Sequence, residues 1–244
     1  MHLTTIFSAF AAVSGVLAAP TASQLDARAV VPHDSLNPIQ TRLQEGAIGR
    51  AILRFQPLLH IAHGCQPYTA VDDRGNTSGG LQDTGNVSAG CRDQNKGQTY
   101  ARAAWHRGKF AIMYAWYWPK DQPAAGNVVG GHRHDWESVV VWLDNPANTN
   151  PRILGAAASG HGGFKPTTSP PTQGNNVKVE YFVEFPYNHA TQFTNTVGRT
   201  YWINDWDTMP NAAKQALTPS TLFRDANVPF RPDVFFSNLD KAFV

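Results

Sequence analysis

Long apolar runs are scarce in this 244-residue chain, and several common functional motifs are missing from it. Beyond the N-terminus the longest apolar stretch, residues 110–118, is about half as long as a membrane-crossing helix. The formal net charge is only +2, and no basic run with interleaved aromatic residues occurs, which excludes a typical nucleic-acid-binding protein. The Gly-x-Ser-x-Gly and His-Glu-x-x-His motifs of serine hydrolases and zinc proteases are also absent.

The N-terminus has the composition of a secretory signal. Residues 3–17 are apolar or small, and small residues around Ala18 suit cleavage, so we predict a signal peptide over residues 1–18 and an extracellular protein. The positive charge before this run is weak, which leaves a non-secreted chain as an alternative. We expect residues 19–32 to form an irregular lead or a short pro-segment, and residues 33–244 to form one domain.

Cysteine is nearly absent as well. The only two cysteines, Cys65 and Cys91, are expected to form a disulfide in a secreted chain. Closing this loop should stabilise the fold by roughly 3–4 kcal/mol, because the enclosed segment is polar and glycine-rich and cannot order itself by apolar burial. Two N-glycosylation sequons begin within it, at Asn76 and Asn86.

Ionisable residues are crowded into one heptad, residues 131–137, which reads Gly-His-Arg-His-Asp-Trp-Glu and precedes a purely β-type run. Asp135 and Glu137 are two residues apart, so they point to the same face of a strand. His132 and His134 lie at odd spacings from both acids, and no straight strand places either histidine beside a carboxylate. Two carboxylates at a strand start, with a histidine from the preceding loop, predict a hard-cation site for Mg²⁺ or Ca²⁺.

A second interpretation of the heptad stays open at this level. Arg133 is well placed in sequence to pair with the acids as an exposed salt-bridge cluster of little energetic consequence. A helix, which would pair histidine with acid, is disfavoured by Gly130 and Gly131 before the acids and by three valines after them.

Strand signals recur along the chain, and helices are appended to them rather than alternating with them. We predict strands at residues 100–105 and 110–118, joined by an Arg107-Gly108 hairpin, and at 135–143, 153–158 and 177–185. Helices are expected at 41–55 and 212–217, the second capped by Asp207. This pattern favours a mostly β fold, a two-sheet β-sandwich with peripheral helices, over an α/β fold.

Two segments also match a known protein family. Residues 131–137 carry the family's heptapeptide unaltered, and residues 111–121 (Ala-Ile-Met-Tyr-Ala-Trp-Tyr-Trp-Pro-Lys-Asp) resemble its second hallmark. Residues 159–163 and 225–230 are similar too. Through these motifs the chain resembles the necrosis- and ethylene-inducing-peptide-like proteins (NLPs) over residues 33–244, and its single cysteine pair matches the subgroup with one disulfide.

The resemblance implies a sandwich similar to actinoporins and fungal lectins, and a secreted effector of plant-associated microbes. Such proteins bind glycosylinositol phosphorylceramides, the sugar-headed sphingolipids of plant plasma membranes, and many then damage the membrane and cause necrosis. A plant immune receptor that senses residues 111–133 is a further expected partner. No nucleic acid and no enzymatic activity are expected.

The resemblance also assigns roles to residues. A divalent cation is held in the family by residues that match Asp121, Asp135 and Glu137, with the match of His132 nearby, often through water. His161, in a glycine-rich loop, is expected at the rim of this cavity. Residues 185–189 resemble the loop that contacts the terminal sugar, which assigns glycan or lipid binding to Phe185, Asn188 and His189. Arg133, His134 and Trp136 fall on the opposite strand face and are expected to pack and hydrogen-bond.

Two alternatives to a cytolysin remain. Several toxic members carry Trp and Asp where this chain has Phe185 and Asn188, which favours a non-cytolytic, lectin-like binder or an immune-pattern carrier. A metal-dependent hydrolase is the other alternative, although the cation set uses up the available carboxylates and leaves no general base.

Overall fold

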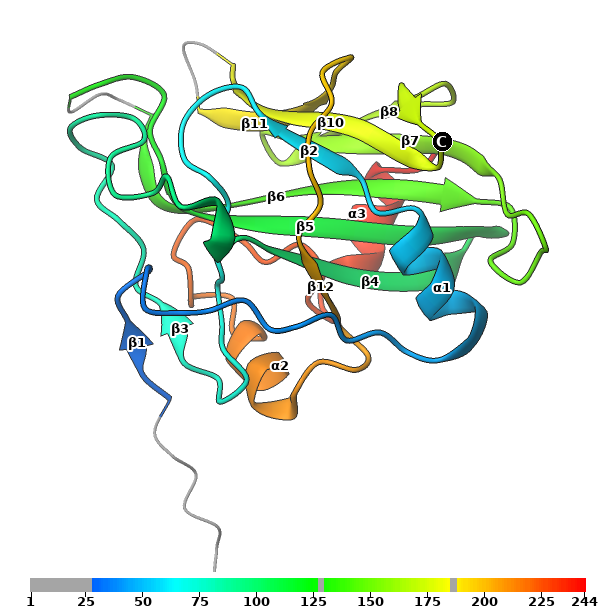
Figure 1. Cartoon of the computed structure of the whole chain (residues 1–244), viewed down its shortest axis with the longest axis horizontal. Coiled ribbons are helices and arrows are strands. Elements are labelled where there is room, and N and C mark those ends of the chain that lie inside the picture. The colour runs from blue at the N-terminus through cyan, green and yellow to red at the C-terminus, as the bar shows by residue number, and fades with distance from the viewer. Residues whose placement is uncertain (1–27, 127–129, 185–187) are drawn as a thin grey trace, which may run out of the picture.

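The structure is a computed structural model that describes residues 28–126, 130–184 and 188–244. The expected signal peptide, Phe185 and most of the expected lead lie outside these ranges. The described residues form two β-sheets, a short parallel strand pair and three α-helices (Figure 1). None of these helices combines the length and the apolar character that crossing a membrane requires.

The larger sheet has six strands, in the order β12-β4-β5-β6-β7-β8. Their bounds are Trp202–Asp205, Gln98–His106, Lys109–Asp121, His132–Leu143, Ile153–Gly160 and Gly163–Thr167, respectively. The smaller sheet has the order β11-β10-β2, with bounds His189–Phe193, Asn176–Val183 and Leu58–Ile61, and β9 (Thr172–Gln173) pairs with β10. Strands β1 (Val30–Val31) and β3 (Thr77–Ser78) pair separately, so the expected irregular lead contains one short strand.

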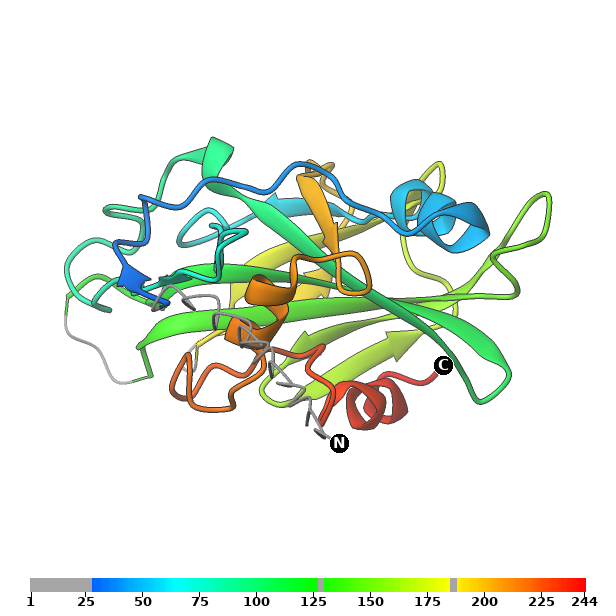
Figure 2. The same cartoon turned by 90° about the horizontal axis from the view of Figure 1, so that it is seen from below.

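The helices cover the sheets from outside, as expected. They are α1 (Gly46–Arg54), α2 (Asn211–Leu217) and α3 (Phe235–Lys241), with a 3-10 turn η1 at Gln94–Lys96. Figure 2 shows α1 and α3 on opposite sides of the six-stranded sheet. The mostly β, two-sheet sandwich with peripheral helices is therefore confirmed.

Strand β5 is buried on both faces, which explains why residues 110–118 within it are continuously apolar rather than alternating. On one face Trp118 stacks on Tyr181 of β10, with ring centroids 3.9 Å apart. On the other face Tyr117 packs against Phe223 of the C-terminal segment at 5.2 Å. The central strands thus form the core between the smaller sheet and the C-terminal segment.

Two tight hairpins set the strand order around the core. Arg107 and Gly108 both have positive φ, of 49° and 82°, and connect β4 to β5 as the sequence predicts. His161 and Gly162, at 51° and 76°, form the corresponding turn between β7 and β8. Paired positive φ values are typical of type I′ hairpin turns, whose twist matches that of the flanking strands.

Both predicted helices differ from the expected ones at their N-termini. Helix α1 begins at Gly46 rather than at residue 41, because Arg42 is extended: its N–H donates to the Ile203 carbonyl (2.9 Å), and its carbonyl accepts from Asp205 N–H (3.1 Å). Helix α2 has Pro210, not Asp207, at its N-cap position. Asp207 lies ahead of the helix, where its carbonyl accepts a hydrogen bond from Lys214 Nζ.

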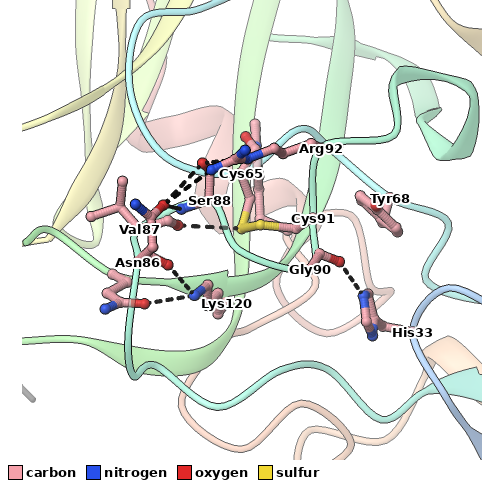
Figure 3. Close-up of a disulfide and its surroundings, with 12 residues drawn as sticks. His33, Cys65, Tyr68, Asn86, Val87, Ser88, Gly90, Cys91, Arg92 and Lys120 are labelled. Carbon is pink, nitrogen blue, oxygen red and sulfur yellow. Dashed lines mark hydrogen bonds between the residues drawn. A yellow bond between two sulfur atoms is a disulfide. The ribbon is translucent and has the colours of Figure 1, made fainter. Parts of the chain in front are cut away.

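The Cys65–Cys91 disulfide is present, with the Cα atoms 5.1 Å apart (Figure 3). Its loop is fastened to β5 by the buried Lys120, whose Nζ donates to the Asn86 carbonyl at 2.9 Å. The disulfide is also tied to the core through Trp118, whose Nε1 donates to the Cys65 carbonyl at 3.1 Å. The segment between the cysteines is therefore anchored to the central sheet at several points.

Candidate functional site: a buried acidic cluster

Near one end of the β5–β6 pair, the regular alternation of side chains between the two faces of the sheet is interrupted. Trp118 pairs with Asp135, and three residues further along β5 Asp121 pairs with His132. Between these pairs stand Pro119, which has no N–H to donate, and His134, whose φ is +66°. Alternation is interrupted there, so Asp121 and His132 reach the same side as Asp135. The sequence correctly excluded a straight strand, but His132 is the first residue of β6 rather than part of a preceding loop.

Asp121, His132 and Asp135 form one compact group. One ligand atom from each lies within 4.8 Å of the other two. Asp121 is fully buried and Asp135 is 6% exposed, whereas His132 is partly exposed. Buried carboxylates this close together are costly unless a cation or a proton neutralises them.

The orientation of His132 leaves a nitrogen directed at the carboxylates. Its Nδ1 lies 2.7 Å from the His134 carbonyl, and because a carbonyl only accepts, Nδ1 carries a proton. Nε2 lies 3.6 Å from Asp121 Oδ2. Burial, the largest single cause, lowers the pKa of His132, but Asp135, Asp121, the hydrogen bond to the His134 carbonyl and Asp225 together raise it overall. Nε2 is therefore the imidazole nitrogen available to a cation in the cluster.

Asp135 is held by Tyr181 of β10. The Tyr181 hydroxyl donates to Asp135 Oδ2 at 2.8 Å. Burial and the nearby Asp121 raise the pKa of Asp135 to about 7. The carboxyl group is therefore poised to exchange its proton for a cation near neutral pH.

Glu137 continues the acidic face one step further along β6. It is 7% exposed and accepts a hydrogen bond from the hydroxyl of Ser159 on β7. Burial and Asp135 raise its pKa well above the usual range. Glu137 lies outside the compact group of three, and its expected role as a cation ligand stays a prediction.

His189 fixes the carboxylate of Asp121 rather than facing the solvent. Its Nδ1 lies 2.6 Å from Asp121 Oδ1, and its backbone N–H donates to Oδ2 at 2.9 Å. The ring stacks on Tyr181 with centroids 4.4 Å apart, and the residue is only 2% exposed. The family resemblance predicts that His189 contacts the glycan, whereas its ring nitrogens contact Asp121 and His63.

A cleft of about 400 Å³ opens beside the cluster. Its walls include Asp135 and Glu137, the His161 turn, Asn188 and residues of α3. His161 is exposed at the rim, where its Nε2 lies 2.9 Å from a Glu184 carboxylate oxygen. Asn188 sits further in, with Nδ2 3.2 Å from His132 Nε2. Of the expected glycan residues, His161, Asn188 and His189 are thus brought to one cleft, and Phe185 lies outside the described residues.

The donor set fits a hard divalent cation. Two carboxylates converge with an imidazole nitrogen, and the Asn188 Oδ1 atom is buried without a hydrogen-bond partner among the described residues. An unpartnered buried amide oxygen is costly, and oxygen atoms are the ligands that Mg²⁺ and Ca²⁺ prefer. Asp121, Asp135 and His132 would hold such an ion, and the amide group of Asn188 lies beside His132.

The remaining heptad residues pack on the other side, as expected. The Arg133 guanidinium donates to the Gly79 carbonyl at 2.8 Å, and among the described ion pairs none joins it to Asp135 or Glu137. The salt-bridge interpretation is therefore wrong, since both acids are buried. His134 Nδ1 lies 2.6 Å from the Tyr117 hydroxyl, and burial, followed by Arg133, lowers its pKa to about 4. Trp136 packs in the core.

The two sequons lie in different surroundings. Asn76 is half-buried, and its Nδ2, the atom that would carry a glycan, donates to Asp72 Oδ2 at 2.8 Å. Asn86 is exposed, and its Oδ1 accepts from the backbone N–H of Ser88 at 3.1 Å. Asn86 is the more accessible of the two acceptors.

Three site residues were missed by sequence reasoning: Tyr181, Ser159 and His63. The alternation of β10 marks Tyr181 as buried, but nothing local indicates that its hydroxyl meets Asp135. His63 lies 2.9 Å from the far nitrogen of His189. Tyr181 contacts Asp135, Ser159 contacts Glu137 and His63 contacts His189, each from another strand or loop, so only tertiary structure reveals them.

The fold and the site define a β-sandwich protein with a buried acidic cluster under an open cleft. Residues 49–242 match the family model described as "Necrosis inducing protein (NPP1)", and the chain belongs to this family. NLP effector protein 10 of Phytophthora capsici is 45% identical over 218 residues, covering 88% of this chain and 92% of the relative.

Solved structures show the same fold. NLPPya in complex with mannosamine is 43% identical with a TM-score of 0.81, covering 88% of this chain and all of that one. The non-toxic protein HaNLP3 is 38% identical with a TM-score of 0.81, covering 86% of this chain and 98% of that one. The comparison thus includes both a sugar-bound member and a member without toxicity.

Proposed function

We propose that this chain is a secreted effector that binds the sugar headgroups of plant sphingolipids in a cation-dependent way and damages the membrane. The single observation that carries the proposal is the Asp121–His132–Asp135 cluster at the wall of an open cleft. The predicted signal peptide supports secretion, and the effector relative supports action on a host. The expected lipids are glycosylinositol phosphorylceramides.

Sugar recognition follows from the chemistry of the cleft. A divalent cation held by Asp121, His132 and Asp135, with Glu137 as a further expected ligand, would supply a Lewis-acidic centre for sugar hydroxyls. Asn188 and His161 add polar groups at increasing distance from the cluster, while α3 forms a further part of the cleft wall. A related structure holds mannosamine, which supports a sugar-sized ligand for this fold.

A non-cytolytic binder is the second candidate. Asn188 provides a neutral amide where several toxic members of the family carry Asp, and HaNLP3 supports the existence of non-toxic members with this fold. Binding and damage are separate outcomes, because a protein can hold a headgroup without disturbing the bilayer. Enzymatic hydrolysis is not proposed, since the buried acids are engaged with Tyr181, Ser159 and His189.

The proposal is tested with vesicles that contain glycosylinositol phosphorylceramide and a trapped dye. Wild-type protein should bind them in Ca²⁺ or Mg²⁺ and release dye, and EDTA or Asp135→Ala should abolish both effects. Asp144→Ala removes an acid outside the cluster and serves as the matched control. Binding without leakage would establish the non-cytolytic alternative, and equal activity of Asp135→Ala and wild type would refute cation dependence.

A further inference from the structure

A line of hydrogen bonds runs from the cation cluster to the loop before the disulfide. His189 Nδ1 lies 2.6 Å from Asp121 Oδ1, and its other ring nitrogen, Nε2, lies 2.9 Å from His63 Nδ1. The two histidine rings are stacked, with centroids 5.1 Å apart and planes inclined by 28°. His63 therefore contacts the residue that fixes Asp121, although it lies outside the acidic heptad and the cleft.

The hydrogen bond between His189 Nε2 and His63 requires a polar side chain at position 63, whether His189 is neutral or protonated. A neutral His189 that donates from Nδ1 to Asp121 has a lone pair on Nε2 and must accept from His63. A protonated His189 carries hydrogen on Nε2 and must donate to His63. In both cases, an apolar residue at position 63 would leave the nearly buried Nε2 without this partner, at the cost of a lost hydrogen bond.

The backbone holds His63 in place on both sides. Ala62 N–H donates to the Tyr181 carbonyl at 3.0 Å, and Gln66 N–H donates to the Cys91 carbonyl at 2.9 Å. Gly64 has a φ of +82°, and a Cβ atom there would lie only 2.7 Å from His189 Nε2. The segment thus approaches His189 closely, and the Cys65–Cys91 bridge follows immediately.

We propose that His63 is a positioning residue for the cation site: it fixes the ring of His189, which fixes the carboxylate of Asp121. The inference rests on the proposed function, because it takes Asp121 as a cation ligand. Residues that orient metal ligands commonly contribute about 10–100-fold to metal affinity. His63 acts through one intervening residue, so we expect an effect of roughly tenfold, at the low end of that range.

The test compares His63→Leu, which fills the space without a polar group, with His63→Asn, which can donate or accept. Calcium and magnesium dissociation constants are measured by calorimetry on EDTA-stripped protein. The nitrogen chemical shifts of His189 are recorded by NMR in the metal-free state. We expect roughly tenfold weaker cation binding and altered His189 shifts in His63→Leu, and near-wild-type values in His63→Asn.

Two results would overturn the inference: unchanged cation affinity in His63→Leu, or the same loss in both variants, which would indicate packing rather than hydrogen bonding. Thermal unfolding in EDTA identifies a general loss of fold, which would lower the melting temperature of both variants. Failure of the proposed function has a different signature, because wild-type protein would then bind no cation. In that case unchanged His189 shifts in His63→Leu would still refute the positioning role.

Discussion

The β5–β6 strand pair has an apolar end and an acidic end. At the apolar end, Met113 faces Val140 and Phe110 faces Leu143 in regular register. At the acidic end, beyond Pro119 and His134, the chain buries Asp121, and Asp135 is almost as inaccessible. Burial of apolar side chains at the apolar end stabilises the fold. Burial of carboxylates at the acidic end is destabilising unless a ligand neutralises them.

The apolar end should respond most strongly to truncation. Trp142 is fully buried, packs at 5.1 Å against Phe243 and donates from Nε1 to the Ala242 carbonyl. Trp142→Ala should lower the unfolding free energy by about 3–5 kcal/mol in urea titrations. Trp105→Ala, at a tryptophan that is 51% exposed, is the control and should cost far less. Equal losses would contradict the assignment of the core.

The disulfide loop should contribute both to the stability of the fold and to cation binding. Replacing Cys65 and Cys91 by alanine should lower the unfolding free energy by about 3 kcal/mol, because the separation of 26 residues sets the loop entropy. It should also weaken cation binding, since the bridge adjoins the His63 segment. Calorimetry on the double variant measures this. A stability loss with unchanged cation affinity would separate the loop from the site.

The acidic end should show an unusual pH dependence. The pKa of Asp135 is raised to about 7, so between about pH 4 and pH 7 the folded protein holds a proton that the unfolded chain has lost. This proton makes the metal-free protein less stable as pH rises. His134, whose pKa is lowered to about 4, acts in the opposite direction over the same range.

The Asp135→Asn variant separates the contribution of Asp135 to the pH dependence of stability from that of His134. Unfolding in EDTA at several pH values should show the variant gaining stability relative to wild type as pH rises from 4 to 7. His134 is common to both proteins, so its contribution cancels in the difference, whereas Asp135 also raises the pKa values of His132 and Glu137, and the difference reports these three groups together. A difference that stays constant with pH would contradict the raised pKa of Asp135.

The smallest effect on stability is expected from the Tyr181 hydroxyl, whose hydrogen bond to Asp135 connects the smaller sheet to the larger one. Tyr181→Phe removes the hydrogen bond to Asp135 but keeps the ring stacked on Trp118. We expect a loss of about 1 kcal/mol in unfolding free energy and a further rise in the pKa of Asp135. Denaturant titration and NMR titration of the carboxyl carbon measure the two effects, and a loss above about 3 kcal/mol would indicate a structural role beyond this bond.

Much of the site could be predicted because its residues are adjacent in sequence. The heptad supplies His132, Asp135 and Glu137, and the Arg107-Gly108 turn follows from local backbone preference. The reversal of faces at His134 could not be predicted, because a non-glycine residue with positive φ has no clear sequence signal. His63 and Tyr181 were missed because they meet the cluster only through strand pairing and loop packing.

Cation binding by metal-free protein tests the central claim most directly. Isothermal titration of EDTA-stripped wild type with Ca²⁺ and Mg²⁺ at a pH above the raised pKa of Asp135, about pH 8, should show one site. Asp135→Asn should show no measurable binding, and Asp144→Asn, outside the cluster, should match wild type. Absence of binding by wild type, or unchanged binding by Asp135→Asn, would contradict the assignment of Asp121, His132 and Asp135 as a cation site.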